Sequence, residues 1–244
     1  MANRLDNRFE NRAEEENRMR KDRIVELSHK IIEGKENFKL SKRVDDVTNI
    51  LPEVKHRPDV WYALGEVTYC THVGTHIEVP FHHRKDGDDI ADFPFRQLIG
   101  RLTVLDFRHK KNGEAISLSE LKAFENTIQS GDILFVWTGM DVHFRTPRWN
   151  DQPHLTIEAN QWLVDRKIGC LGSDAAGLEV PGTDYQPNHQ ALFNAGIPMI
   201  ESATNLGAVI RGDWIVFILP LPIVGLEASP LRIIAIPRED LHDA

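Results

Sequence analysis

Three histidines and one glutamate lie within eleven residues of this sequence, all at alternate positions. They are His72, His76, Glu78 and His82. In an extended segment, residues of the same parity project from one face, so we expect these side chains to lie together. Imidazole and carboxylate groups suit a divalent transition metal such as zinc or manganese. Because a metal held this way turns water into a nucleophile near neutral pH, the pattern predicts a metal-dependent hydrolase.

Other interpretations of the same residues are weaker. A single histidine in a strand is usually a surface or structural residue, but three histidines and a glutamate on one face need partners if they are buried. Gly74, Thr75 and Pro80 indicate that the strand is kinked and irregular. The spacing is not the H-E-x-x-H of a helical zinc site. A serine or cysteine hydrolase is disfavoured, because we find no G-x-S-x-G elbow and no cysteine with a suitably spaced histidine.

The eleven-residue segment resembles the motif H-x-G-T-H-x-D-x-P-x-H of the cyclase-like metal-dependent hydrolases, the family of the bacterial kynurenine formamidases and isatin hydrolases. Every fixed position matches except that Glu78 stands where the family has aspartate. His189, followed twelve residues later by Glu201, reproduces the spacing of the family's two distal metal ligands. The resemblance extends over residues 23–241 and includes the segments 136–139, 168–174 and 219–237.

This resemblance implies an α/β (α+β) fold, a layered β/β/α arrangement of the swivelling type with a mixed sheet at its core. It also implies Zn²⁺, one or two ions per subunit, or Mn²⁺. A formamidase-like site holds two ions bridged by the motif carboxylate, and an isatin hydrolase-like site holds one. Glu78 is one methylene longer than aspartate, so its added length is either absorbed by a backbone shift or abolishes the bridge. The implied ligands are His72, His76, Glu78, His82, His189 and Glu201.

The reaction that the resemblance implies is hydrolysis of a carbonyl–nitrogen bond in an aryl formamide, amide or lactam. An arylformamidase of tryptophan catabolism is the single activity that it favours. His82 and Glu201 are candidates for moving the proton to the leaving nitrogen. Lactam opening, as in the isatin hydrolases, and a dehydratase or cyclase activity are alternatives within the family. A non-catalytic metal-binding or scaffold protein is the alternative from another class, and only Glu78 favours it.

Composition and charge set the remaining expectations. The chain has 244 residues, 41% of them hydrophobic and 27% charged, which suits one domain over residues 23–244. Residues 1–22 are dense in Arg, Glu and Asn and predict a charged helical arm. A net charge of −8 argues against nucleic-acid binding. We expect no membrane span, a cytoplasmic location and a homodimer or homotetramer that acts on a small aromatic molecule.

Hydrophobic periodicity predicts alternating strands and helices in the second half of the chain. Thr156 is a candidate N-cap, and Ser117 or Ser119 is another. Trp61, Tyr62, Phe81 and Phe93 flank the motif and could stack on a planar ring, although packing in the core is the default for aromatic residues. A polar loop at 140–152 could cover the site and hold a substrate carboxylate through Arg148. Strands are expected at 24–28, 61–71, 101–107, 132–137, 168–171, 197–200, 214–219 and 231–236, and helices at 117–127, 156–166 and 189–195.

Overall fold

A computed structural model describes residues 23–241. Its main sheet has eight strands in the order β1-β12-β11-β5-β7-β9-β10-β4. Strand β4 also pairs with β12, so seven of these strands close into a barrel, with β1 added outside β12. Strands β5, β7, β9 and β10 are parallel, and the other pairings are antiparallel. The strands are β1 (Val25–Glu26), β4 (His76–Glu78), β5 (Ile99–Asp106), β7 (Ile133–Trp137), β9 (Cys170–Ser173), β10 (Met199–Glu201), β11 (Trp214–Pro220) and β12 (Ala228–Pro237).

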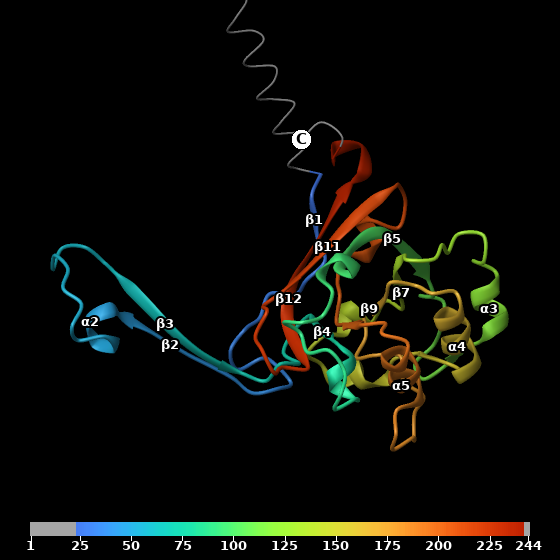
Figure 1. Ribbon diagram of the computed structural model, residues 1–244, viewed down its shortest axis with the longest axis horizontal. Coiled ribbons are helices and arrows are strands. Elements are labelled where there is room, and N and C mark those ends of the chain that lie inside the picture. Colours follow the sequence, from blue (N-terminus) through green and yellow to red (C-terminus); the bar gives the residue numbers. More distant parts are fainter. Residues whose placement is uncertain (1–22, 242–244) are drawn as a thin grey trace, which may run out of the picture.

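Three helices pack beside the parallel strands, on the side of the barrel away from β1 and β12 (Figure 1). They are α3 (Leu118–Lys122), α4 (Ile157–Asp165) and α5 (Pro187–Asn194). Ser117 caps α3 through a reciprocal capping box with Glu120, and Thr156 caps α4. Thr156 was predicted as an N-cap, and Ser117 was one of the two candidates, with Ser119, for the other. Helix α3 is shorter than expected, since the chain passes into turns after Lys122.

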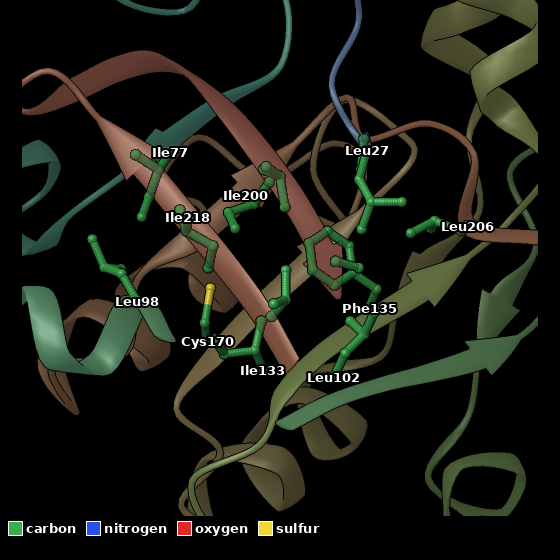
Figure 2. Close-up of a cluster of buried hydrophobic side chains, with 14 of the residues drawn as sticks. Leu27, Ile77, Leu98, Leu102, Ile133, Phe135, Cys170, Ile200, Leu206 and Ile218 are labelled. Atoms are coloured by element: carbon green, nitrogen blue, oxygen red, sulfur yellow. The ribbon is translucent and has the colours of Figure 1, made fainter. Parts of the chain in front are cut away.

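Two apolar clusters hold the fold together, one inside the barrel and one beneath the helices. Strand β7 is buried on both faces, so its alternate residues belong to different clusters. Ile133 and Phe135 lie in the barrel interior with Ile77 and Ile200 (Figure 2). Leu134 and Val136 pack under the helices with residues of α4 and α5. The barrel interior is therefore filled with side chains, and functional residues must lie at its rim or on its outer face.

A second, small sheet projects from the body as an arm (Figure 1). It consists of β2 (Leu40–Asp46) and β3 (Ala63–Tyr69), joined through α2 (Val47–Ile50). Both strands are mostly exposed. The sequence predicted a strand over 61–71 but not its partner β2, because β2 lacks apolar alternation. The remaining short elements are β6 (Ala115–Ile116), β8 (His154–Leu155), η1 (Pro80–His82), η2 (Phe95–Leu98), η3 (Met140–His143), η4 (Pro147–Asp151), η5 (Leu206–Ala208) and η6 (Arg238–Leu241).

The α/β class and the mixed sheet are therefore confirmed, and the structure adds that the sheet closes on itself. The predicted helical arm of residues 1–22 lies outside the described residues. Between residues 23 and 241, no helix is both long enough and apolar enough to span a bilayer.

Candidate metal centre

Strand β4 closes the barrel and carries two of the predicted ligands. It lies between β10 and β12, with Glu201 opposite His76 and Ala228 opposite Glu78. The side chain of Ile77 belongs to the apolar cluster inside the barrel. Because side chains alternate along a strand, His76 and Glu78 point to the other face. Both are nearly fully buried.

The segments on either side of β4 bend the remaining motif histidines toward Glu78. The chain turns at Gly74, whose φ of +69° is the left-handed conformation that glycine adopts readily. After Val79, the 3₁₀ helix η1 begins at Pro80 and contains His82. The motif is thus a turn, a three-residue strand and a helical turn. The expected alternation on one strand face holds for His76 and Glu78. His72 and His82 lie outside the strand, and the turn at Gly74 and the 3₁₀ helix η1 place them near Glu78.

Thr75 ties this irregular segment to the neighbouring strands. Its hydroxyl donates to the carbonyl of Ser202 at 2.5 Å and accepts from the backbone N–H of His29 at 2.9 Å. Its own carbonyl accepts from the N–H of Leu231. These bonds fix the motif against the end of β10, where Glu201 lies, so the motif and the distal glutamate are held as one unit.

The carboxylate of Glu78 lies at the centre of the predicted residues. Its Oε1 is 2.9 Å from His72 Nδ1, 3.5 Å from His76 Nε2 and 3.8 Å from His82 Nε2. Its Oε2 is 3.6 Å from His189 Nε2. Glu201 lies 3.5 Å from His76 Nε2 through Oε2 and 3.7 Å from His189 Nε2 through Oε1. All six predicted side chains therefore converge on one place.

The chemistry of this cluster fits a bound cation. Among residues 23–241, two groups of ligand atoms lie within 4.8 Å of one another: His72, Glu78 and His82, and His76, Glu78 and Glu201. Two ligands of one tetrahedral zinc ion are separated by about 3.4 Å, since each lies roughly 2.1 Å from the metal. Five of the observed separations, 3.5 to 3.8 Å, are close to this value, whereas the 2.9 Å between His72 Nδ1 and Glu78 Oε1 is shorter.

Glu78 supplies an independent test of that fit. Its Oε2 is buried and has no hydrogen-bond partner among the described residues. A buried carboxylate oxygen left without a partner is costly. Burial raises the pKa of Glu78, but the rings of His72 and His76 outweigh it and hold the pKa well below its usual range. The carboxylate is therefore ionised at neutral pH, and a cation would supply the partner that Oε2 lacks.

His189 reaches the cluster from α5. Its Nε2 faces Glu78 and Glu201, and its Nδ1 lies 2.7 Å from Glu179 Oε2. Burial lowers the pKa of His189, but Glu179, Glu201 and Glu78 outweigh it and raise the pKa to about 10. The three carboxylates around His189 therefore favour a positive charge at this ring, carried either by a proton on the imidazole or by a metal ion bound to it.

Several other polar and aromatic residues near the site have structural roles. Asp174 accepts hydrogen bonds from the N–H and hydroxyl of Thr138 and the N–H of Gly139, so it caps the end of β7. The acidic run at 86–89 forms a turn. Phe93 is buried in the core, as expected by default, and Phe81 packs against the same cluster.

The aromatic residues beside the site differ from those expected. Trp61 and Tyr62 are exposed next to β3 of the arm. Phe144 and Trp149 of the predicted covering loop line a small cavity against His76 and Glu201. In the same loop, Arg148 is exposed and Arg145 pairs with Glu36. The role of Arg148 toward a substrate carboxylate stays a prediction.

Two carboxylates at the site were missed in the sequence. Glu179 contacts His189, and Glu227 Oε1 lies 3.2 Å from His72 Nε2. Neither residue belongs to the spaced motif, and glutamate in a loop carries no signal of its own. Only the pairing of β12 with β4 and the position of α5 bring them to the site.

The family assignment follows from comparison with known proteins. The chain matches the family described as "Putative cyclase" over residues 25–180, and it belongs to that family. A kynurenine formamidase of Bacillus mycoides is 28% identical over 175 residues, which cover 71% of this chain and 80% of that protein. A kynurenine formamidase of Geobacillus thermodenitrificans is 28% identical over 169 residues, covering 69% of this chain and 78% of that protein.

Solved structures share the fold. An isatin hydrolase superposes with a TM-score of 0.73 at 19% identity, covering 88% of this chain and 92% of its own. A protein described as a potential metal-dependent hydrolase with cyclase activity superposes with a TM-score of 0.68 at 24% identity, covering 88% and 98%. The chain is thus a distant relative of metal-dependent hydrolases, with a His/Glu group that could hold a metal ion.

Proposed function

We propose that this protein is a metal-dependent hydrolase that cleaves a carbonyl–nitrogen bond, with an aryl formamide as the favoured substrate. The observation that carries the proposal is the convergence of four histidines and Glu201 on the carboxylate of Glu78, whose buried Oε2 has no hydrogen-bond partner among the described residues. Similarity to kynurenine formamidases over 71% of the chain supports the choice of substrate class.

In this proposal, Glu78 is shared between two ligand groups. His72, His76 and Glu78 would hold one Zn²⁺ or Mn²⁺ ion, and His82, His189 and Glu201 would complete a second position. The added methylene of glutamate is compatible with sharing, since Oε1 faces three histidines while Oε2 faces His189. When bound, a divalent ion supplies a water of lowered pKa for attack and a positive charge for the carbonyl oxygen.

His82 is the candidate for proton transfer. Burial lowers the pKa of its imidazole and outweighs the opposing charge of Glu78, so the ring is neutral at pH 7. A neutral imidazole accepts the proton released as the carbonyl is attacked and returns it to the leaving nitrogen, which departs as an amine. The side chain is 26% exposed, so it can meet a substrate at the open side of the site. Glu201 takes this role if His82 is committed as a ligand and Glu201 is not.

The cavity beside the ligands favours a small acyl group. Phe38, Phe144 and Trp149 enclose about 40 Å³ against His72, His76 and Glu201. A cavity this small suits a short acyl group better than a long one. The formyl group of an aryl formamide is the shortest acyl group, which agrees with the proposed substrate.

The first test is the metal content per subunit, measured by plasma mass spectrometry on protein purified without chelator. Near two equivalents of zinc would support a shared Glu78, and near one would support a mononuclear site with His82 free for proton transfer. Absence of metal even after reconstitution would overturn the proposal. Glu78→Gln keeps the volume and removes the charge, so we expect it to lose metal, while Glu158→Gln on the exposed face of α4 serves as the control.

Activity is the second test. We expect the metal-loaded protein to hydrolyse an aryl formamide, to lose that activity on chelation and to regain it when metal is restored. A matched aryl acetamide should react more slowly because of the small cavity. If metal is retained but formamides, lactams and esters are all left intact, the non-catalytic metal-binding alternative stands instead.

A further inference from the structure

Each deeply placed histidine of the site has one nitrogen facing the central carboxylates and the other held from outside. His76 Nδ1 lies 3.0 Å from the carbonyl of Gly74. His72 Nε2 lies 3.2 Å from Glu227 Oε1, and His189 Nδ1 lies 2.7 Å from Glu179 Oε2. A neutral imidazole carries hydrogen on one nitrogen only, so the outer acceptor decides which nitrogen keeps a free lone pair.

The ring nitrogen that faces the central carboxylates is not the same in all three histidines. His76 and His189 present Nε2 to the centre, whereas His72 presents Nδ1, 2.9 Å from Glu78 Oε1. A ring rotated by half a turn would no longer offer Nδ1 to Glu78. For His72, the group that opposes this rotation is the carboxylate of Glu227.

Glu227 is itself fixed in place. Its carbonyl accepts from the N–H of Val79, directly after β4, and its Oε1 accepts from the hydroxyl of Thr71 at 2.6 Å. The pairing of β12 with β4 therefore sets this carboxylate against the outer edge of His72.

Glu179 contacts the outer nitrogen of His189 at the start of α5, as Glu227 contacts that of His72. Its carboxylate accepts from the backbone N–H groups of Asn188 and His189 as well as facing His189 Nδ1. It therefore fixes both the first turn of the helix and the ring that the helix carries. Replacing Glu179 would therefore disturb helix α5 as well as the ring of His189, whereas Glu227 does not cap a helix.

We propose that Glu227 and Glu179 are positioning residues of the metal centre, which fix the rings of His72 and His189 so that Nδ1 and Nε2, respectively, face Glu78. The inference rests on the proposed metal site. A carboxylate that accepts from a ligand histidine fixes the ring and raises its basicity, and its loss typically lowers metal affinity by roughly 10- to 100-fold.

The experiment measures the affinity of the metal-free protein for Zn²⁺ by competition with a chromophoric chelator, and the absorption spectrum after loading with Co²⁺. We expect Glu227→Ala and Glu179→Ala to weaken Zn²⁺ binding roughly 10- to 100-fold and to alter the Co²⁺ bands. Glu227→Gln keeps an acceptor oxygen and should recover part of the affinity. Thr71→Val removes the other partner of Glu227 and should produce a smaller loss in the same direction. Glu158→Ala is the control.

Different results would overturn the proposed function and the positioning role of Glu227. Wild-type protein that binds neither Zn²⁺ nor Co²⁺ would overturn the proposed function. Wild-type protein that binds metal, with the Glu227 variants equal to it in affinity and spectrum, would overturn the positioning role and leave the proposed function standing. If Glu179→Ala does not fold, as circular dichroism of the metal-free protein would reveal, the Glu227 variants alone decide the outcome, because Glu227 does not cap a helix.

Discussion

Gly177 lies directly against the carboxylate of Glu201: a Cβ added at Gly177 would be 2.6 Å from Glu201 Oε1 and 3.5 Å from the ring of His189. A contact of 2.6 Å is not tolerated, so a side chain here must displace the carboxylate of Glu201, whereas 3.5 Å from His189 is an ordinary contact. Gly177 also has a φ of +73°, which is unfavourable for other residues. Glycine is therefore required at position 177 for two reasons, the backbone conformation and the closeness of the Glu201 carboxylate.

We expect Gly177→Ala to lower Zn²⁺ affinity and hydrolysis at least 10-fold, since the carboxylate of Glu201 must shift. Gly182→Ala is a matched control, because Gly182 has a φ of +76° and open space around its Cα. Both variants carry the left-handed penalty of about 1–2 kcal/mol, so both should lose that much stability in urea unfolding. Equal Zn²⁺ affinity in the two variants would show that the contact between position 177 and Glu201 does not affect metal binding.

Arg145 and Glu36 form an ion pair that fastens the segment 30–38 to the loop that lines the cavity. The Glu36 side chain is 2% exposed and that of Arg145 is 17% exposed. Removing one partner leaves a buried charge unpaired, which typically costs about 3–5 kcal/mol. We expect Arg145→Ala to show such a loss in urea unfolding and to raise KM.

The double variant with Glu36→Gln should be less destabilised than the sum of the single variants, because no buried charge is then left alone. Arg148→Ala, an exposed arginine of the same loop, is the control for stability, and it should change unfolding by less than about 0.5 kcal/mol. Strict additivity in this cycle would contradict the coupling of the two segments.

The capping box of α3 predicts a defined pH dependence of stability. The bond from Lys110 and the bonds from Ser117 lower the pKa of Glu120 from 4.5 to about 2. A lowered pKa in the folded state adds stability that is present above pH 4.5 and is lost as pH falls toward 2. The side chain is 34% exposed, so we expect Glu120→Gln to cost only about 0.5 kcal/mol at pH 7.

The difference in unfolding free energy between wild type and Glu120→Gln should shrink between pH 4.5 and 2. Urea titrations at pH 7, 4 and 3 measure it. Glu158→Gln, in the first turn of α4, should show a much smaller shift over the same range. A difference that stays constant down to pH 3 would contradict the role of the ionised carboxylate.

The arm suggests how the proposed homodimer or homotetramer forms. A two-stranded hairpin is marginally stable alone, and this one exposes Val44 at 61%, Val67 at 59% and Trp61 at 71%. We expect Val67→Asp and Trp61→Ser to weaken self-association at least 10-fold in sedimentation experiments. Val224→Asp, at a residue that is 81% exposed elsewhere, should leave association unchanged. A wild-type protein that is monomeric at every concentration would contradict this prediction.

Much of the fold could be predicted because local patterns agree with it. Short runs rich in apolar residues indicated β5, β7, β11 and β12, and the candidate N-caps Ser117 and Thr156 indicated the starts of two helices. The arm was the main omission. Its strand β2, Leu40–Asp46, is mostly polar and exposed, so no hydrophobic period distinguishes it from a loop.

The types and spacing of the motif residues, with His189 and Glu201, are properties of the chain, so six of the side chains that gather at the site could be identified without a structure. How they meet depends on the packing of segments that are distant in the chain. The closure of the barrel by β4 sets Glu201 opposite His76, and bends at Gly74 and Pro80 replace the extended strand that the spacing suggested. The outer carboxylates Glu179 and Glu227 come from distant segments, and strand pairing and helix packing are non-local, so no local pattern could reveal them.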